Sequence, residues 1–313
     1  MPESNGLHVS VMLAETLAAL AVRPDGLYVD CTFGRGGHSA SLLRLLGQSG
    51  RILAMDKDPA ALASPEAKAL LQDSRFALVH GSFAGLRQQA ERMGMAGKVD
   101  GVLMDLGVSS PQLDEAQRGF SFLRDGPLDM RMDTSQGPTA AEWLSVTDAE
   151  EIIRVLRTYG EERFARRIAL AIVAARPIAS TRQLAAVIER AVPFKEKHKH
   201  PATRSFQAIR IAVNRELDEL EEGLKNSLEV LAPGGRLVVI SFHSLEDRIV
   251  KHFIREQERG KPVPARMPIV DVHRPVLRAV GKAKKPTEDE VRANARSRSA
   301  VLRVAEKAMP CAV

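Results

Sequence analysis

Residues 27–39 read LYVDCTFGRGGHS, a short apolar strand followed at once by a glycine-rich turn and the start of a helix. Three more apolar runs follow it: RILAMD at residues 51–56, FALVH at residues 76–80 and VDGVLMD at residues 99–105. Near-continuous apolar strands separated by stretches with helical spacing are typical of a parallel sheet covered on both faces. The sequence therefore predicts an α/β, Rossmann-like, doubly wound sheet.

The next comparable strand, RLVVIS at residues 236–241, begins 131 positions after Asp105. A strand–helix–strand crossover needs only about 30 residues, so roughly 100 residues are surplus. The surplus predicts helices: one capped near Asp148, one with a 3.6-residue period from Tyr159 to Ala175, and one opened by Ser180. We expect a discontinuous domain of residues 1–112 and 213–313, interrupted by a mostly helical, basic, substrate-binding domain at residues 113–212.

Charge is unevenly distributed along the chain. The whole chain has a net charge of +6, but residues 154–215 carry 14 basic and 4 acidic side chains, and residues 251–313 carry 15 and 7. Cationic blocks of this size attract polyanions and bind phosphates through counterion release. A merely solvated surface has the same composition, so charge alone supports nucleic-acid binding and a plain soluble surface about equally.

Three features of the sequence bear on the cellular compartment: its cysteines, its apolar runs and its N-terminus. Cys31 and Cys311 lie too far apart in sequence to suggest a disulfide framework or a CxxC metal site. No apolar run approaches the roughly 20 residues of a membrane span, and the N-terminus lacks the basic and apolar regions of a signal peptide. We expect a reducing, cytoplasmic location. We also expect a loosely ordered segment at residues 255–296, followed by a last strand at residues 299–304.

The glycine-rich turn does not by itself identify a ligand. The third glycine of a dinucleotide fingerprint is replaced by Ser39, and no Lys-Ser/Thr pair completes a P-loop. A tight turn without a ligand would use the same glycines.

The residues that end the strands are more specific. Asp56 stands 19 residues after Gly37, and an acidic side chain at this strand end accepts hydrogen bonds from ribose hydroxyls. Phe83 follows the third strand, where its ring can lie against a purine. Asp30 and Asp105 end the first and fourth strands; carboxylates repel a pyrophosphate but favour the cationic ammonium and sulfonium of S-adenosyl-L-methionine (SAM). The pattern favours SAM over other nucleotides.

Ordered motifs then run along nearly the whole chain: HVSVML (8–13), TFGRGGHS (32–39), DLGVSSPQLD (105–114), RGFSF (118–122), GPLDMRM (126–132), YGEER (159–163), HPATR (200–204) and ISFHSLEDR (240–248). Through these motifs the chain resembles the bacterial small-subunit rRNA cytosine-N4 methyltransferases, the RsmH or MraW family. The resemblance implies a class I SAM-dependent methyltransferase sheet split by a helical domain, and methylation of a cytidine in 16S rRNA near the decoding centre of the small ribosomal subunit. It also implies a homodimer. The cofactor contacts that it implies are Gly36, Gly37, His38, Asp56, Phe83, Asp105 and Gln112.

The sequence does not single out one residue as the proton acceptor in catalysis. Amino-methylating enzymes often carry an Asp/Asn-Pro-Pro-aromatic loop after the fourth strand, whereas this chain continues Asp105-Leu-Gly-Val-Ser109-Ser110. Asp105, Ser109 and Ser110 are candidate proton acceptors, although Asp105 could serve the cofactor alone, and His243 is a weaker candidate. Methylation at C5 needs an attacking thiolate, and neither cysteine is suitably placed. Candidate rings for stacking on the base are Phe120, Phe122 and Phe242.

RNA contacts are expected from the basic insertion, chiefly Arg163, Arg166, His200 and Arg204. His198 and His200 stand among lysines without a carboxylate or cysteine, so we predict phosphate contacts there and no metal. Two other functions stay open: a DNA amino-methyltransferase, and a nucleic-acid-binding regulator that keeps SAM as a ligand.

Overall fold

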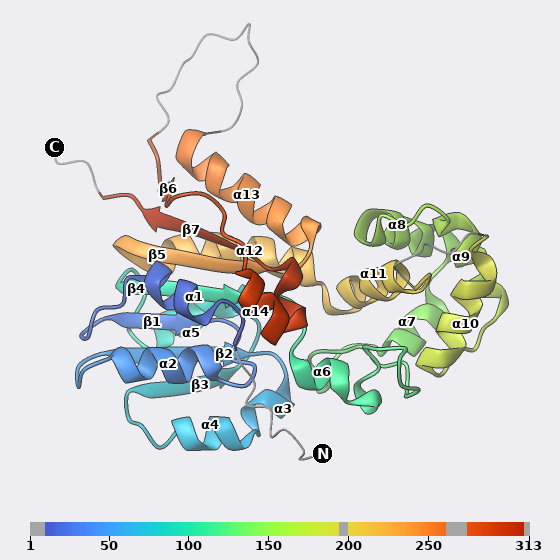
Figure 1. Ribbon diagram of the computed structural model, residues 1–313, viewed down its shortest axis with the longest axis horizontal. Coiled ribbons are helices and arrows are strands. Elements are labelled where there is room, and N and C mark those ends of the chain that lie inside the picture. Colours follow the sequence, from blue (N-terminus) through green and yellow to red (C-terminus); the bar gives the residue numbers. More distant parts are fainter. Residues whose placement is uncertain (1–9, 194–199, 261–273, 310–313) are drawn as a thin grey trace, which may run out of the picture. The chain divides into compact units, whose positions relative to one another are not determined.

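The computed structural model describes residues 10–193, 200–260 and 274–309 (Figure 1). The chain divides into two compact units: unit 1 is Met1–Gly107 with Asp218–Val313, and unit 2 is Val108–Leu217. These boundaries lie five residues from the expected ones at each junction. His198, Lys197, Lys199 and Cys311 lie outside the described residues.

Unit 1 is built around one sheet. Its strands are β1 (Leu27–Asp30), β2 (Arg51–Asp56), β3 (Phe76–His80), β4 (Val99–Asp105), β5 (Leu231–Ser241), β6 (Leu277–Ala279) and β7 (Val301–Lys307). Its helices are α1 (Leu13–Leu20), α2 (Gly37–Leu45), α3 (Pro59–Leu62), α4 (Pro65–Leu70), α5 (Leu86–Arg92), α12 (Glu216–Val230, which begins in unit 2), α13 (Ser244–Arg259) and α14 (Glu288–Ala293), with 3-10 turns η1 (Phe83–Gly85) and η3 (Ala295–Ser299).

The strand order is β3-β2-β1-β4-β5-β7-β6. Neighbouring strands from β3 to β5 are parallel, as the apolar runs predict, and β7 pairs antiparallel with both β5 and β6. The α/β, Rossmann-like prediction is therefore confirmed, with an antiparallel pair at one edge that the sequence pattern did not predict.

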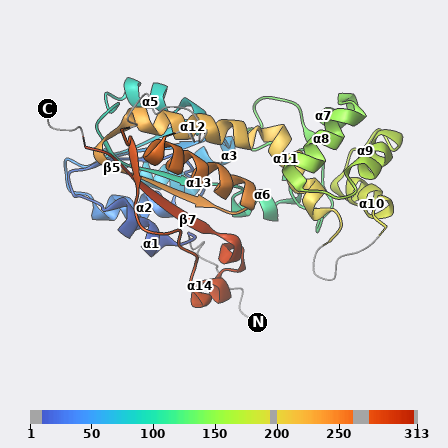
Figure 2. The ribbon, with the colours of Figure 1, turned by 90° about the horizontal axis from the view of Figure 1, so that it is seen from above.

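Helices cover both faces of this sheet, as Figure 2 shows. Because successive strand side chains point to opposite faces, the apolar runs supply two cores at once. On β2, Leu53 packs in the core that contains α5, α12 and α13, whereas Ile52 packs in the core that contains α1 and α2. Leu237 and Val238 on β5 divide between the two cores in the same way. Burial on both faces explains why these strands are apolar throughout.

Two expectations for the second half of unit 1 need correction. The strand expected at residues 236–241 begins at Leu231, because Leu231 already pairs with Val99; the next pair is Arg236 with Gly101, and the intervening Pro-Gly segment bulges out. The segment 255–296 is more ordered than expected where it is described. Residues up to Arg259 continue α13, whose apolar face packs on the sheet, and β6 and α14 follow.

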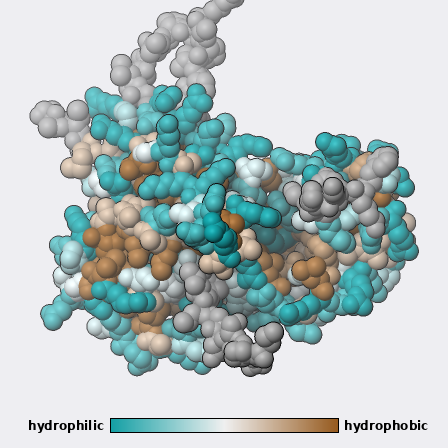
Figure 3. Space-filling model, viewed as in Figure 1, coloured by the Kyte–Doolittle hydropathy of each residue, from teal (hydrophilic) through white to brown (hydrophobic). Residues whose placement is uncertain are grey.

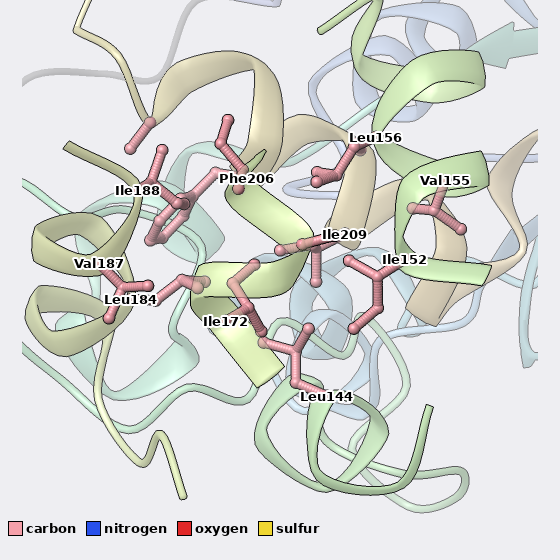
Figure 4. Close-up of a cluster of buried hydrophobic side chains, with 14 of the residues drawn as sticks. Leu144, Ile152, Val155, Leu156, Ile172, Leu184, Val187, Ile188, Phe206 and Ile209 are labelled. Atoms are coloured by element: carbon pink, nitrogen blue, oxygen red, sulfur yellow. The ribbon is translucent and has the colours of Figure 1, made fainter. Parts of the chain in front are cut away.

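Unit 2 is helical. Its elements are α6 (Ser110–Asp114), η2 (Ala116–Arg118), α7 (Ala140–Val146), α8 (Ala149–Gly160), α9 (Ala165–Ala174), α10 (Thr181–Ala191) and α11 (Thr203–Asn214). Figure 4 shows their shared core, in which Leu156, Ile172, Leu184 and Ile209 are fully buried. None of the described helices of the chain is both long and apolar enough to span a membrane.

The helix caps of unit 2 lie where the sequence predicts them, but one helix begins later than expected. Asp148 caps α8, and Ser180 forms a capping box with Gln183 at the start of α10. The helix expected from Tyr159 to Ala175 begins only at Ala165, as α9, because Tyr159 and Gly160 still belong to α8. Gly160 ends α8 close to α11, and Glu161 takes the left-handed conformation with φ 48°, which turns the chain before α9.

Candidate functional site

The candidate cofactor residues of unit 1 lie at or just after the carboxyl ends of strands of one sheet, whose arrangement Figure 1 shows. Strands β1, β2, β4 and β5 are parallel neighbours, so their carboxyl ends lie together. Asp30 is in register with Ala54 near the end of β2, and Asp105 is in register with Ile240 near the end of β5. In open α/β sheets this edge is where ligands bind.

Two glycines of the loop between β1 and α2, Gly36 and Gly37, leave no room for larger side chains. Gly36 has φ 71°, which favours glycine, and a Cβ atom there would lie 2.7 Å from the Phe33 ring. A Cβ atom on Gly37 would lie 2.1 Å from Oγ of Ser10, a buried residue ahead of α1. The loop is therefore packed against the segment before α1, a contact that the sequence did not reveal.

Asp56 ends β2 and is held by two backbone N–H groups. Gly34 donates to Oδ2 over 2.7 Å, and Asp58 donates to Oδ1 over 2.8 Å. Burial raises the pKa of Asp56 to about 6, although these two hydrogen bonds act in the opposite direction. The carboxyl group is thus mostly ionised at neutral pH, which suits an acceptor for ribose hydroxyls.

Asp30, at the end of β1, is almost fully buried. Oγ of Ser39 donates to its Oδ2 over 2.7 Å, and the backbone N–H of Thr32 donates to Oδ1 over 3.1 Å. Burial raises the pKa of Asp30, and these hydrogen bonds only partly offset it. Ser39 thus explains the incomplete dinucleotide fingerprint, because its hydroxyl stabilises a buried carboxyl group at a position where a glycine could not.

His38 and Asp105 form the most distinctive pair at this edge. His38 is buried, and its Nε2 lies 3.5 Å from Oδ2 of Asp105. Burial favours the neutral ring, but the carboxylates of Asp105 and Asp30 outweigh it and raise the pKa of His38. The backbone N–H of Asp105 donates to Oγ1 of Thr32 over 2.7 Å, which ties β4 to the loop after β1.

Some buried polar atoms of this pair have no hydrogen-bond partner among the described residues. They are both ring nitrogens of His38 and Oδ1 of Asp105. Buried polar atoms normally have partners, so these atoms indicate a place for a polar ligand. Two carboxyl groups beside a glycine loop fit the cationic amino-acid end of SAM, and Asp56 fits its ribose.

Phe83 begins η1 three residues after the end of β3 and packs against α12. A Cβ atom on Gly223 would lie 2.7 Å from Cδ2 of Phe83, so the helix approaches the ring closely. Glu219 of α12 accepts a hydrogen bond from Oγ of Ser82 over 2.7 Å, and Nζ of Lys57 lies 2.8 Å from the same carboxylate. This network fixes the loops after β2 and β3, and no local pattern in the sequence predicts it because its members are far apart in the chain.

His243 follows β5 and caps α13. The backbone N–H of Glu246 donates to Nδ1 of His243 over 3.3 Å, while the carboxylate of Glu246 accepts from the N–H groups of Phe242 and His243 over 2.8 and 3.2 Å. Nδ1 is thus an acceptor, and Nε2 lies 3.1 Å from Oε1 of Glu246. The ring is held at the sheet edge by the helix start. Phe242 lies near Gly107, where a Cβ atom would be 3.7 Å from its ring.

The other candidates near the start of the insertion belong to unit 2. Ser109 precedes α6, and its backbone N–H donates to Oε1 of Gln112 over 2.9 Å. Gln112 is buried, whereas Ser109 and Ser110 are partly exposed. The structure therefore gives the Gln112 carbonyl a local capping role, and a cofactor contact from Gln112 stays a prediction.

The aromatic candidates of unit 2 already pack on protein groups. Phe120 is buried, with the Arg118 guanidinium 5.8 Å from the centre of its ring. Phe122 stacks on His200 with ring centres 4.5 Å apart and meets Phe206 edge-on at 4.9 Å. These contacts anchor the motif of residues 118–122 to the start of α11.

The basic candidates of unit 2 differ in exposure. Arg163 and Arg166 are exposed, and no ion pair involves either of them within the described residues. Arg204, at the start of α11, is half-buried, and His200 is exposed with its Nδ1 accepting from the N–H of Ala202 over 3.2 Å.

The order β3-β2-β1-β4-β5-β7-β6, a glycine loop after β1 and acidic residues at the ends of β1, β2 and β4 together define a class I SAM-dependent methyltransferase. Comparison with known proteins is more specific. A family model described as the MraW methylase family matches residues 5–308. The chain is 57% identical over 307 residues to the ribosomal RNA small subunit methyltransferase H of Alteromonas mediterranea, covering 96% of this chain and 97% of that protein. The chain belongs to the MraW methylase family.

Solved structures are more distant. A proposed rRNA methylase from Clostridium thermocellum matches with a TM-score of 0.45 and 13% identity, covering 96% of this chain and all of that one. An rRNA methylase from Streptococcus thermophilus matches with a TM-score of 0.42 and 13% identity, covering 95% of both chains. The fold class follows from the strand order of the sheet itself.

Proposed function

We propose that this chain transfers the methyl group of SAM to the N4 amino group of a cytidine in 16S rRNA, near the decoding centre of the small ribosomal subunit. The observation that carries the proposal is the pair of buried His38 and partly buried Asp105 beside the glycine loop, which leaves three buried polar atoms without a hydrogen-bond partner among the described residues. The rRNA substrate is supported by the 57% identical relative, whose name states small-subunit rRNA methylation.

The chemistry requires alignment first. The N4 lone pair is delocalised into the cytosine ring, so the enzyme must hold it in line with the methyl group, which can supply roughly 7–11 kcal/mol. A proton acceptor near N4 adds about 10²–10⁴-fold. SAM, when bound, supplies an activated methyl group on a cationic sulfur.

Asp105 is the first candidate for the acceptor because its Oδ1 has no partner among the described residues. Ser109 and Ser110 follow it closely in the chain, and His243 stands at the end of the neighbouring strand. Asp105 would instead serve only the cofactor if both its oxygens faced the cationic end of SAM.

Methylation at carbon C5 is disfavoured by the state of Cys31. The side chain is buried, and burial together with the nearby Asp30 raises the pKa of its thiol well above the ordinary value. A thiolate nucleophile is therefore not available there at neutral pH. This supports transfer to the exocyclic nitrogen.

We further propose that unit 2 binds the RNA backbone through Arg163, Arg166, His200 and Arg204, that the chain acts in the cytoplasm, and that it forms a homodimer. Size-exclusion chromatography with light scattering tests the dimer directly.

Two experiments separate the proposed function from its alternatives. Nucleoside mass spectrometry of rRNA from cells with and without this chain should show the loss of one N4-methylated cytidine. Tritiated methyl transfer to small subunits, naked 16S rRNA and duplex DNA then identifies the substrate. Transfer to DNA alone would favour a DNA amino-methyltransferase, and SAM binding without transfer to any nucleic acid would favour a regulator.

A further inference from the structure

A cationic groove of about 350 Å³ lies on unit 1 between α13, β6 and β7. It is lined by five cationic side chains, Lys251, Arg255, Arg259, Lys282 and Arg303, and by one carboxylate, Glu258. The part of Figure 3 that corresponds to α13 in Figure 1 is mostly hydrophilic at its surface. None of these side chains has a role in the cofactor site described above.

Three of the cations form one row on α13. Lys251, Arg255 and Arg259 are spaced by four residues, so they lie on the same face of the helix and about 6 Å apart along its axis. That spacing is comparable to the separation of successive phosphates along a single nucleic-acid strand. Ile254 and Val304, both buried, form an apolar floor beside the row.

Ion pairs neutralise only part of this charge. Arg303 is bound by both oxygens of Asp247, at 2.6 and 2.9 Å, and Arg259 lies 3.6 Å from the carboxylate of Glu258. Glu258 also accepts a hydrogen bond over 3.2 Å from the N–H of Ala279, which holds the edge strand β6 against the helix.

Lys251, Arg255 and Lys282 form no ion pair within the described residues. Lys282 is brought to the groove by Gly281, whose φ of 71° turns the chain after β6. Cations of one sign gathered along a concave surface raise the local positive potential, which attracts anions.

The row of cations on α13 extends away from the carboxyl edge of the sheet. Helix α13 starts next to His243, at the carboxyl end of β5, and Lys251 stands eight residues further, about 12 Å along the axis. A strand whose base reaches the carboxyl edge of the sheet could therefore continue along α13.

We infer that the groove binds the sugar-phosphate backbone of an RNA strand that continues from the target nucleotide, with Lys251, Arg255 and Lys282 contacting phosphates. This inference rests on the proposed function for the identity of the strand. It assigns to unit 1 a part of RNA binding separate from the arginines of unit 2.

The test is a triple variant, Lys251→Gln/Arg255→Gln/Lys282→Gln, compared with a control triple, Lys68→Gln/Arg92→Gln/Lys225→Gln. The control removes the same charge from exposed positions on α4, α5 and α12. Binding to a short fluorescein-labelled single-stranded RNA is followed over a range of salt concentrations, and SAM binding is measured by calorimetry. The groove triple should lose about tenfold or more in RNA affinity at low salt, with a salt slope smaller by about 2. The control triple should change RNA affinity by less than about twofold, and both should bind SAM normally.

Equal RNA affinity and salt slope in the two triples would overturn the inference. So would a groove triple that binds RNA normally but loses binding of polyglutamate, because the partner would then be an acidic protein. If the wild-type chain methylates no cytidine while the groove triple still loses RNA binding, the proposed function fails and the groove inference stands. If the wild-type chain methylates cytidine N4 and the groove triple binds RNA normally, only the groove inference fails.

Discussion

The carboxylate of Asp56 accepts a hydrogen bond of 2.7 Å from the backbone N–H of Gly34, which joins the end of β2 to the glycine loop after β1. The side chain expected to hold the ribose therefore also holds the loop that we expect to face the rest of the cofactor. Burial raises the pKa of Asp56 to about 6, so the ionised carboxylate that is present at neutral pH destabilises the ligand-free protein.

Replacing Asp56 by Asn should weaken SAM binding and change the pH dependence of stability. A carboxyl group whose pKa rises from 3.8 to about 6 on folding binds more protons in the folded state, so it destabilises the protein as pH increases from 4 to above 6. The loss is at most about 3 kcal/mol. Thermal unfolding of ligand-free Asp56→Asn should lack this decrease, while calorimetry should show weaker SAM binding. The exposed Asp25→Asn serves as the control. Unchanged SAM affinity would exclude Asp56 from the ribose site.

His38 should lose a proton when SAM binds. The carboxylates of Asp105 and Asp30 raise the pKa of His38, and a cation bound beside them would compete with the charged ring. Near neutral pH, the apparent binding enthalpy should therefore depend on the ionisation enthalpy of the buffer in the wild type but not in His38→Gln. A wild-type enthalpy that is the same in phosphate and in Tris would contradict this assignment.

Gly37→Ala should weaken SAM binding because the new methyl group would meet Oγ of Ser10 at 2.1 Å. Overpacking costs about 1–3 kcal/mol, which corresponds to about 5-fold to 150-fold in affinity if the loop moves. Gly85→Ala is the matched control, since a Cβ atom there meets nothing within 4 Å. If both variants bind SAM equally well, the loop does not contact the cofactor.

Charge reversal of Arg163, Arg166 and Arg204 to Glu should weaken RNA binding and leave SAM affinity intact, because these residues belong to unit 2. Filter binding with 16S rRNA and calorimetry with SAM measure the two effects. Reversal of Lys68, Arg92 and Lys225 controls for net charge. Equal loss of RNA and SAM binding would show that the two roles are not divided in this way.

The sequence predicted the elements whose signal is local. The apolar runs that end in Asp56 and Asp105 correspond to β2 and β4 without any shift, since burial on both faces requires apolar residues throughout. Ser180 and Asp148 were recognisable as caps because a capping bond spans only two or three residues.

Contacts between residues far apart in the sequence were not predictable from local sequence patterns. The packing of Ser10 on the glycine loop, the network around Glu219 and the hydrogen bond from the N–H of Met12 to Glu290 over 2.6 Å all join separate parts of the chain. The start of α9 at Ala165, six residues after the expected Tyr159, was not predictable for a related reason. The pattern of arginines and apolar residues runs across the turn, and only the close approach of Gly160 to α11 shows why α8 ends there.

The insertion of unit 2 between β4 and β5 also bears on how the chain folds. Asp105 pairs with Ile240, 135 positions later, so the middle of the sheet forms only when a very long loop closes. Helical segments with local contacts assemble quickly, whereas distant strand pairing is slow. We therefore expect unit 2 to become compact early and the β4–β5 pairing to set the folding rate, with loop-shortening variants of unit 2 accelerating it.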